Sequence, residues 1–357
     1  MTLPDYIYST GISANEPMYG RYEHPIKALI EEASNSWKKK NTVVKTLFNV
    51  EESHKYRETI MGQSTFSTFD TKNEGEKAGY DTVQKTFDTG IEHVTFGKTF
   101  VITREMMDDS QIGISSDIKK VTKNFIASYY RTQIALCCKA LANGTNESMT
   151  FGTGDKVIYL KTGDDLPVFH KAHPYALKKL EGKTQSNYFN APKDKTIEEI
   201  LNALTSKIRN FKDENEECLS YVADTVIIPC NRPSLETRVK AACGSERTTG
   251  SANNDINVQY GNWTVVVLEG WETTADELMV MSSDANKELS GNMFYNRVKL
   301  DITNEIDKET RNFLWNGYCR FGVGFGSWKH IARCTISAEN ANATDLFDEE
   351  ADAEASA

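Results

Sequence analysis

The chain has 357 residues, of which 39% are hydrophobic and 26% are charged, and its formal net charge is −10. This length exceeds what one small hydrophobic core needs and predicts two or three lobes. The negative charge argues against a general nucleic-acid-binding protein, because such proteins usually present a basic surface. The seven cysteines include no CxxC pair, which is typical of reduced thiols in a cytosolic setting. With no secretory signal and no run of about 18 uncharged apolar residues, we expect a soluble protein made in a cytoplasm.

Residues 1–50 are rich in aromatic residues and turn formers. We expect a short helix from Pro25 to Lys39 and a strand from Thr42 to Val50. Aromatic side chains that such an arm cannot bury by itself would pack either on the body of the protein or on another subunit. The sequence leaves both alternatives open.

Residues 51–92 contain few aliphatic side chains and many Thr, Ser, Gly, Lys and Asp residues. Alternation at Ser64–Phe69, a turn-rich tip at Lys72–Glu76 and a second extended run from Tyr80 to Phe87 predict a long two-stranded excursion. An isolated ribbon is only marginally stable in water. This one therefore either needs a partner surface or is a disordered insertion.

The strand expected at His93–Thr103 is followed by the longest helical pattern of the chain, Ser115–Asn143. Its apolar stripe advances in steps of three or four residues through Ile118, Val121, Phe125, Tyr129, Thr132, Leu136 and Ala140. Short polar side chains at its start can cap the first turn, and a glycine after Asn143 can end it. A helix of about 28 residues is about 42 Å long and can cross a whole domain.

The second half of the chain alternates between helical and extended patterns. An amphipathic helix is expected at Lys195–Asn210, with Thr196 as its cap, and a helix that begins with a proline is expected at Pro233–Ala242. Expected strands or extended runs are Thr225–Cys230, Trp263–Trp271, Glu277–Ser282, Asn292–Ile302, Asn312–Phe325 and Trp328–Ile336. The glycine-rich end of the run at Asn312–Phe325 predicts a bulged or closely packed strand. Residues 338–357 are acidic and rich in alanine, and we expect them to be disordered.

The sequence supplies little catalytic or ligand-binding chemistry. His170 and His173 have HxxH spacing beside Asp164 and Asp165, and two such histidines can ligate a metal. Their context is a loop with Pro174 and without HExxH, so packing or a loop hydrogen bond is the better interpretation. No nucleophile elbow, phosphate loop or dinucleotide-binding motif is present. We therefore predict no catalytic residue, no cofactor-binding residue, no metal ligand and no cofactor.

Taken in order, these elements resemble the plan of the HK97-fold major capsid proteins of tailed double-stranded DNA phages. Phe96–Asp109 (FGKTFVITREMMDD) is similar to the segment that leads from the E-loop toward the spine helix of that family. Asp164–Pro174 (DDLPVFHKAHP) is similar to the DG-x-x-LF-x-x-x-HP stretch of Mu-like major head proteins, although Asp165 replaces the glycine and Val168 the leucine. Phe321–Ile331 (FGVGFGSWKHI) resembles the glycine-rich strand near the C-terminus of the family.

The resemblance implies an α+β, HK97-like capsid fold. Its parts would be an N-terminal arm (1–50), an extended β-hairpin E-loop (51–92), a peripheral domain (93–220) with the spine helix (115–143), an axial domain (221–292), return strands of the peripheral domain (293–337) and an acidic disordered tail (338–357). By the same resemblance the E-loop reaches onto a neighbouring subunit. Some members form crosslinks from an E-loop lysine to a distant asparagine, and the lysines here are Lys72, Lys77 and Lys85.

The implied function is that of a major capsid protein, not an enzyme, whose hexamers and pentamers form an icosahedral shell around phage DNA. Because the chain starts with the arm, a separate scaffold protein is expected, with portal and decoration proteins as further partners. DNA would be enclosed without sequence-specific binding, and no membrane is involved. The expected location is the virion, after synthesis in the bacterial cytoplasm. The alternatives are a subunit of an encapsulin-like compartment and a soluble metal-dependent hydrolase that uses His170 and His173.

Overall fold

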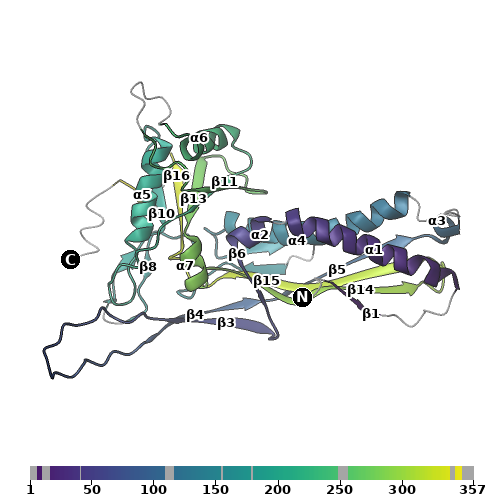
Figure 1. The fold of residues 1–357 in the computed structure, drawn as a ribbon, viewed down its shortest axis with the longest axis horizontal. Helices are drawn as coiled ribbons and strands as arrows, with labels where there is room; N and C mark the ends of the chain where they lie inside the picture. The colour runs from purple at the N-terminus through teal and green to yellow at the C-terminus, as the bar shows by residue number, and fades with distance from the viewer. Residues whose placement is uncertain are drawn as a thin grey trace.

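The protein is described by a computed structural model that covers residues 6–9, 17–40, 42–108, 116–153, 156–177, 180–247, 256–337 and 342–347. Two lobes and a long hairpin make up this part of the chain (Figure 1). The mixture of helices and strands confirms the expected α+β class.

The first lobe is built on a five-stranded sheet. Its order is β1 (Tyr6–Ser9), β14 (Asn292–Ile306), β15 (Phe313–Phe325) and β5 (Val94–Ile102), and β2 (Asn49–Glu52) also pairs with β14. Alternate side chains of β15 face the interior, which buries Trp315 and Phe321. The ring of Trp315 stacks on Phe100 of the neighbouring strand at 6.0 Å between centroids. This pairing confirms the strands expected near His93–Thr103 and Asn312–Phe325.

The long helix α4 (Ser116–Ala142) lies over this sheet beside helix α1 (Pro17–Lys40) (Figure 1). Every residue of its expected stripe from Ile118 to Ala140 is buried or half-buried, which confirms the predicted helix. The helix also buries a second side, because α1 packs there. The Tyr130 hydroxyl lies 2.7 Å from Ser34 Oγ, and its ring stacks on Trp37. Cys137 and Cys138 are both buried, so the adjacent pair is inaccessible.

Two expectations for the N-terminal region were wrong. Helix α1 does not begin at Pro25 but runs through it, although an interior proline costs a helix about 3 kcal/mol. Burial of Ile26 and Ile30 beyond this point offsets that cost. The expected strand Thr42–Val50 is mostly helix α2 (Thr42–Leu47), because Val44 and Leu47, spaced by one helical turn, are the buried residues.

The second lobe is built on a six-stranded sheet. Its order is β12 (Thr264–Leu268), β11 (Thr225–Pro229), β13 (Asp276–Met281), β16 (Ile331–Ile336), β10 (Tyr188–Ala191) and β17 (Thr344–Asp345). Helices α5 (Ile197–Arg209) and α6 (Pro233–Gly244) pack in this lobe. Thr196 and Glu199 form a capping box at the start of α5, which confirms the expected cap.

This packing differs from the expected grouping of segments. The expected peripheral domain groups residues 93–220 and 293–337 with the spine helix, whereas α5, β10 and β16 lie in the second lobe. The reason is the turn after β15, which carries the chain out of the first sheet so that β16 pairs with β13 and β10. The predicted disordered tail, residues 338–357, also includes residues that belong to the fold. Thr344–Asp345 pairs with β10 and Leu346 is buried, whereas residues 338–341 and 348–357 lie outside the described residues.

Smaller elements complete the described chain. They are α3 (Arg104–Asp108), α7 (Ser283–Glu288), the hairpin of β6 (Ser148–Phe151) with β7 (Lys156–Tyr159), and the short pair of β8 (His173–Pro174) with β9 (Thr184–Gln185). Within the described ranges, none of the helices is both long enough and apolar enough to cross a membrane.

Candidate functional site

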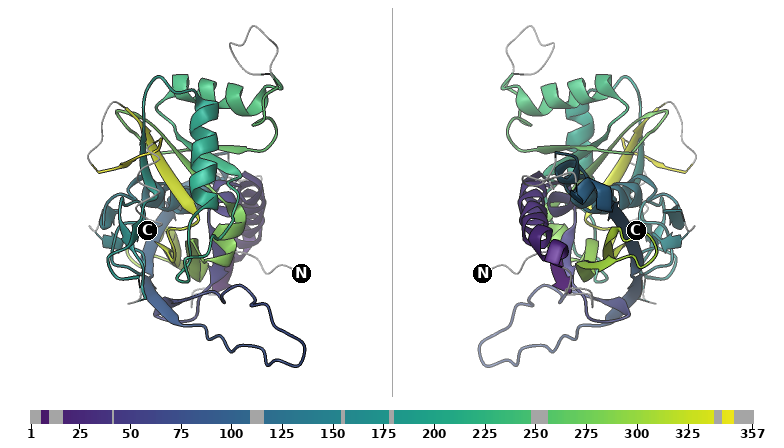
Figure 2. Two further views of the ribbon diagram at one scale, coloured as in Figure 1. Left: turned by 90° about the vertical axis from the view of Figure 1, so that its left-hand side faces the viewer. Right: turned by 90° about the vertical axis from the view of Figure 1, so that its right-hand side faces the viewer.

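A hairpin projects from the junction of the two lobes (Figure 1, Figure 2). Strand β3 (Arg57–Gln63) pairs antiparallel with β4 (Lys85–Glu92), with Arg57 opposite Glu92 and Gln63 opposite Lys85. Residues 64–84 extend beyond these strands without forming a strand themselves. The expected excursion is therefore present, but its paired part is shorter than expected. The run at Ser64–Phe69 lies outside the paired strands, and of the run at Tyr80–Phe87 only the end, from Lys85 on, belongs to β4.

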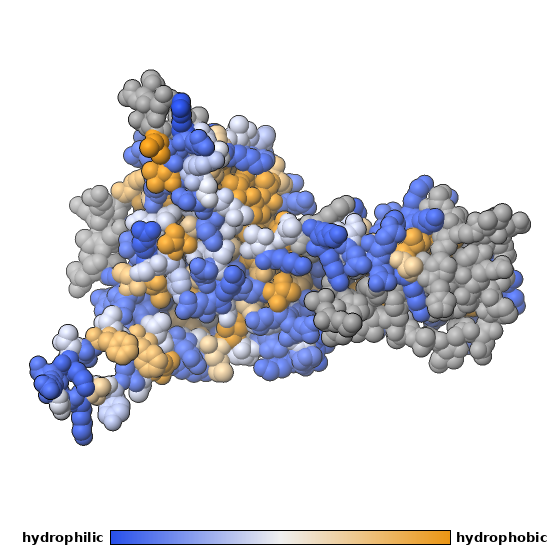
Figure 3. Space-filling view, in the orientation of Figure 1, coloured by the Kyte–Doolittle hydropathy of each residue, from blue (hydrophilic) through white to orange (hydrophobic). Residues whose placement is uncertain are grey.

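Large aromatic side chains are exposed on the distal part of this hairpin. Phe69 and Tyr80 are fully exposed and Phe66 is 64% exposed. In Figure 3 the end of the hairpin is hydrophilic, and apolar atoms lie between that end and the body. Of the hairpin lysines, Lys72 and Lys77 are exposed and Lys85 pairs with Asp88 at 2.5 Å. Exposed rings of this size are typical of surfaces that another molecule covers.

The base of the hairpin is held by a small apolar cluster. Ile91 packs with Met293 and Tyr295, and Ile60 lies against them. The glycine-rich end of β15 allows this contact, because a Cβ on Gly324 would lie only 2.6 Å from Ile91 Cγ1. A Cβ on Gly322 would likewise lie 2.6 Å from the carbonyl oxygen of Glu92. The expectation of a closely packed glycine-rich strand is thus confirmed.

Further along, polar contacts tie the hairpin to the turn at residues 213–217. Thr65 Oγ1 donates to the carboxylate of Asp213, and the backbone N–H of Thr68 donates to Glu217 Oε1 at 2.7 Å. Asn215 Nδ2 in turn donates to the carbonyl oxygen of Thr65 at 2.8 Å. These bonds place the start of the 64–84 segment against the second lobe.

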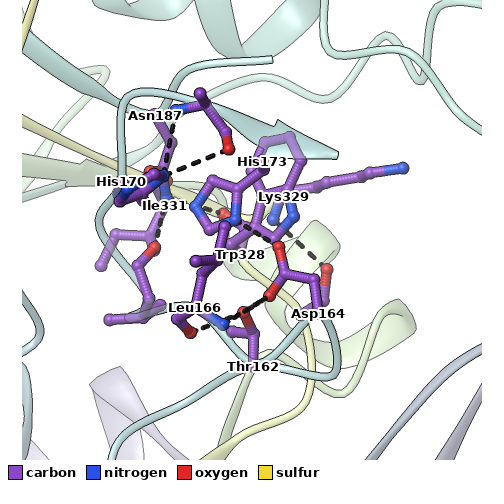
Figure 4. A network of polar contacts seen from close by, with 12 residues as sticks. Thr162, Asp164, Leu166, His170, His173, Asn187, Trp328, Lys329 and Ile331 are labelled. Atoms are coloured by element: carbon purple, nitrogen blue, oxygen red, sulfur yellow. Dashed lines mark hydrogen bonds and ion pairs between the residues drawn. The ribbon is translucent and has the colours of Figure 1, made fainter. Parts of the chain in front are cut away.

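A buried Asp–His pair lies near the base of the hairpin (Figure 4). His173 Nδ1 is 2.6 Å from Asp164 Oδ2, and both side chains are almost fully buried. Trp328 stacks on the His173 ring, with 4.3 Å between centroids and 11° between planes. Thr162 Oγ1 and the N–H of Leu166 donate to the other carboxylate oxygen of Asp164.

The environment of this pair determines its protonation. Burial lowers the pKa of His173, and this effect outweighs the hydrogen bond and charge of Asp164. Burial alone would raise the pKa of Asp164, but the hydrogen bonds from His173, Thr162 and Leu166 outweigh it and lower that pKa. The arrangement fits an ionised Asp164 carboxylate that accepts a hydrogen bond from the Nδ1–H group of a neutral His173 imidazole.

A second buried ion pair lies beside the first. Lys329 Nζ is 3.5 Å from Glu214 Oε1, and the two side chains are 15% and 9% exposed. Burial lowers the pKa of Lys329, although Glu214 and Asp213 oppose the shift. Glu214 Oε2 also accepts from the backbone N–H of Ala176 at 2.9 Å. Asp164, Asp213, Glu214 and Lys329 border a cavity of about 290 Å³ between the hairpin base and the second lobe.

The fully buried Asn187 joins the segments around these pairs. Its Nδ2 donates to the carbonyl oxygens of Val168 at 2.7 Å and Ile331 at 3.2 Å, and its Oδ1 accepts from the N–H of His170 at 3.0 Å. Loop 162–174, strand β10 and strand β16 are thereby held together (Figure 4). The network satisfies buried polar groups and fixes a loop, which is a positioning role.

The HxxH histidines do not share a ligand geometry. His173 Nδ1 is hydrogen-bonded to Asp164, whereas His170 Nδ1 accepts a hydrogen bond from the backbone N–H of Ala172 at 3.1 Å. The described residues contain no group of three or more His, Cys, Asp or Glu side chains that could hold a metal ion. Loop hydrogen bonding, the interpretation favoured by the sequence, describes both histidines. Three further members of this network are Asn187, Trp328 and Lys329, which the sequence does not identify because their spacing carries no motif.

Comparison with known proteins gives a family match over most of the chain. The model of a family described as "Phage capsid protein" matches residues 86–334. Comparison with curated protein sequences gave no match.

Solved structures similar to this one include the following three. They are the capsid of an empty GTA particle (12% identity, TM-score 0.49, 84% of this chain and 90% of that chain), Mycobacterium phage Patience (11%, 0.48, 96% and 94%) and the capsid of Ralstonia phage GP4 (9%, 0.47, 83% and 87%). The family assignment rests on the sequence match and not on these distant structural similarities.

Proposed function

The chain belongs to the phage capsid protein family, and from this premise we propose that it is the major capsid protein of a tailed double-stranded DNA phage. In this proposal the subunit has an HK97-like fold. Its hexamers and pentamers form an icosahedral shell around the packaged DNA. The same proposal assigns it a structural and not an enzymatic role.

The observation that carries the proposal is the hairpin of residues 57–92. Its paired base is anchored by Ile60 and Ile91, whereas Phe66, Phe69 and Tyr80 are exposed. An isolated two-stranded ribbon gains little stability in water, and exposed rings favour association. A neighbouring subunit that covers this surface explains both features.

The two sheets support a proposed division of the chain into domains. The hairpin serves as the E-loop, and the lobe with α1 and α4 serves as the arm and peripheral domain. The lobe with α5, α6 and the six-stranded sheet serves as the axial domain. This division moves residues 188–209 and 331–336 from the peripheral to the axial part, because their elements pack there.

Partners and location follow from the same proposal. We expect a scaffold protein during assembly, and portal and decoration proteins in the finished particle. DNA is enclosed without sequence-specific contacts, which fits a subunit with a net charge of −10. The subunit is made in the bacterial cytoplasm and resides in the virion capsid.

The test is negative-stain electron microscopy with sedimentation velocity on the same purified sample. We expect closed shells tens of nanometres across, formed by heterologous contacts. Deletion of Thr71–Thr82 should abolish the shells and leave a folded subunit, which circular dichroism and thermal unfolding can verify. Double substitution Phe69→Ser and Tyr80→Ser should weaken assembly in the same direction. Normal shells from the deletion variant would contradict the assigned role of the hairpin.

A further inference from the structure

The topology of the second sheet brings the ends of several strands to one edge. Strands β10 and β16 are parallel, and β17 is parallel to β10. Strand β13 runs antiparallel to β16, and β11 runs antiparallel to β13. The C-terminal ends of β10, β16, β17 and β11 therefore meet the N-terminal end of β13 at the same edge of the sheet.

Three basic side chains line a cavity of about 500 Å³ at this edge. Arg232 follows β11, Arg238 lies on α6, and the exposed Lys193 follows β10. Asp276, at the start of β13, is the one acidic residue among the described residues that line it. It lies 4.0 Å from Arg232 Nε and 3.6 Å from Arg238 Nη1. Three cations beside one carboxylate leave two positive charges in excess, although the whole chain carries −10.

The described chain ends close to this cavity. Leu346 is buried, its N–H donates to the carbonyl oxygen of Asn190 at 2.9 Å, and Lys195 Nζ lies 4.9 Å from the centroid of the Phe347 ring. These contacts fix the point from which the last ten residues depart. Five of the next seven residues are acidic: Asp348, Glu349, Glu350, Asp352 and Glu354.

We propose that the acidic segment 348–354 binds in cis to the basic cavity lined by Lys193, Arg232 and Arg238. Strands β17 and β13 are three positions apart in the sheet, which corresponds to about 14 Å. Five extended residues span about 17 Å, so Asp352, the fifth residue after Phe347, reaches the cavity without any change in the sheet. Arginine forks bind carboxylates in a bidentate manner, which makes this segment a fitting occupant.

The test is zero-length carbodiimide coupling on the full-length protein, mapped by peptide mass spectrometry. Lys193 should couple to carboxylates of 348–354 in preference to Lys308, an exposed lysine between β14 and β15 of the first lobe. Arg232→Gln with Arg238→Gln should reduce this yield about fivefold, the effect of losing two partly exposed ion pairs. Arg209→Gln, at the far end of α5, should leave the yield unchanged.

An equal mixture of ¹⁴N- and ¹⁵N-labelled protein separates the two possible sources of the tail. Coupled peptides of one isotope only indicate binding in cis and support the proposal. Mixed-isotope pairs at Lys193 would show that the tail binds a second copy, and this would overturn the proposal. Equal coupling at Lys193 and Lys308, or a yield that the double substitution leaves unchanged, would also overturn it. None of these outcomes depends on shell assembly.

Discussion

The folded protein should lose stability below about pH 6.5 because of one buried histidine, His330. Its side chain is fully buried, and Nε2 lies 2.8 Å from Asn292 Oδ1. Burial lowers the pKa of His330 from 6.5 to about 3. Asn292 also donates to the carbonyl oxygen of Leu47 at 2.9 Å, so this histidine lies where the N-terminal segment joins the two sheets.

The sign and size of the effect follow from proton linkage. Between pH 6.5 and pH 3 the unfolded chain binds a proton at His330 that the folded protein does not bind. Stability therefore falls as the pH falls through this window. At pH 5 the unfolded histidine is almost fully protonated, and the free energy of unfolding is lower by about 2 kcal/mol than at pH 7.5. Burial also lowers the pKa of His93 and His173, so both act in the same direction.

The assay compares the wild-type subunit with His330→Gln, whose amide can still donate to Asn292. Urea unfolding of dilute, unassembled protein is followed by tryptophan fluorescence at pH 7.5 and at pH 5. The wild type should lose about 2 kcal/mol more than the variant between these pH values. Because His93 and His173 titrate in both proteins, their contributions cancel in the difference. Equal losses in the two proteins would refute a neutral, buried His330.

Three further predictions concern the hairpin base, the Asp–His pair and a helix cap. Gly324→Ala should destabilise by about 1–3 kcal/mol and speed hydrogen exchange in β3 and β4, because the new methyl group overlaps Ile91. The matched control is Gly244→Ala, where an added Cβ would meet none of the described residues beyond its own helix within 4 Å, and equal exchange in both variants would exclude the close contact. Asp164→Asn should cost about 2 kcal/mol in urea unfolding through the lost charged hydrogen bond to His173, whereas the exposed neighbour Asp165→Asn should be neutral. Thr196→Ala should cost about 1 kcal/mol by the same measurement, and no loss would contradict the capping box.

Periodic patterns in the sequence predicted the parts of the fold whose burial is local. The stripes of the helices at Ser115–Asn143 and Lys195–Asn210 identified both elements to within one or two residues. The region before residue 50 failed because its pattern is ambiguous at short length. Thr42–Val50 is as compatible with a strand as with a helical turn, and packing of Val44 and Leu47 decided it.

Long-range contacts could not be predicted in the same way. Strand β16 looks like a continuation of the preceding glycine-rich strand, but only pairing with β13 places it in the other sheet. The buried network shows the same limit. Asp164 and His173 are close in sequence, whereas Trp328 stacks on that histidine from a segment more than 150 residues away. No spacing rule joins residues at such separation.

The energetics of the hairpin differ between its base and its distal part. At the base, Ile60 and Ile91 are packed against buried residues, and the glycines of β15 let the hairpin approach that strand closely. Beyond the strands, the contacts with residues 213–217 are polar. The two bonds to the carboxylates of Asp213 and Glu217 contribute about 1.5–3 kcal/mol each, and the bond from the Asn215 amide contributes about 0.5–1.5 kcal/mol. Covering an exposed aromatic ring contributes about 1.5–3 kcal/mol. Because Phe66, Phe69 and Tyr80 are all exposed, a partner that covers all three rings gains about as much free energy as the loss of all three polar contacts costs. In the proposed shell we therefore expect the base of the hairpin to stay fixed and its distal part to exchange contacts with its own lobe for contacts with a neighbouring subunit.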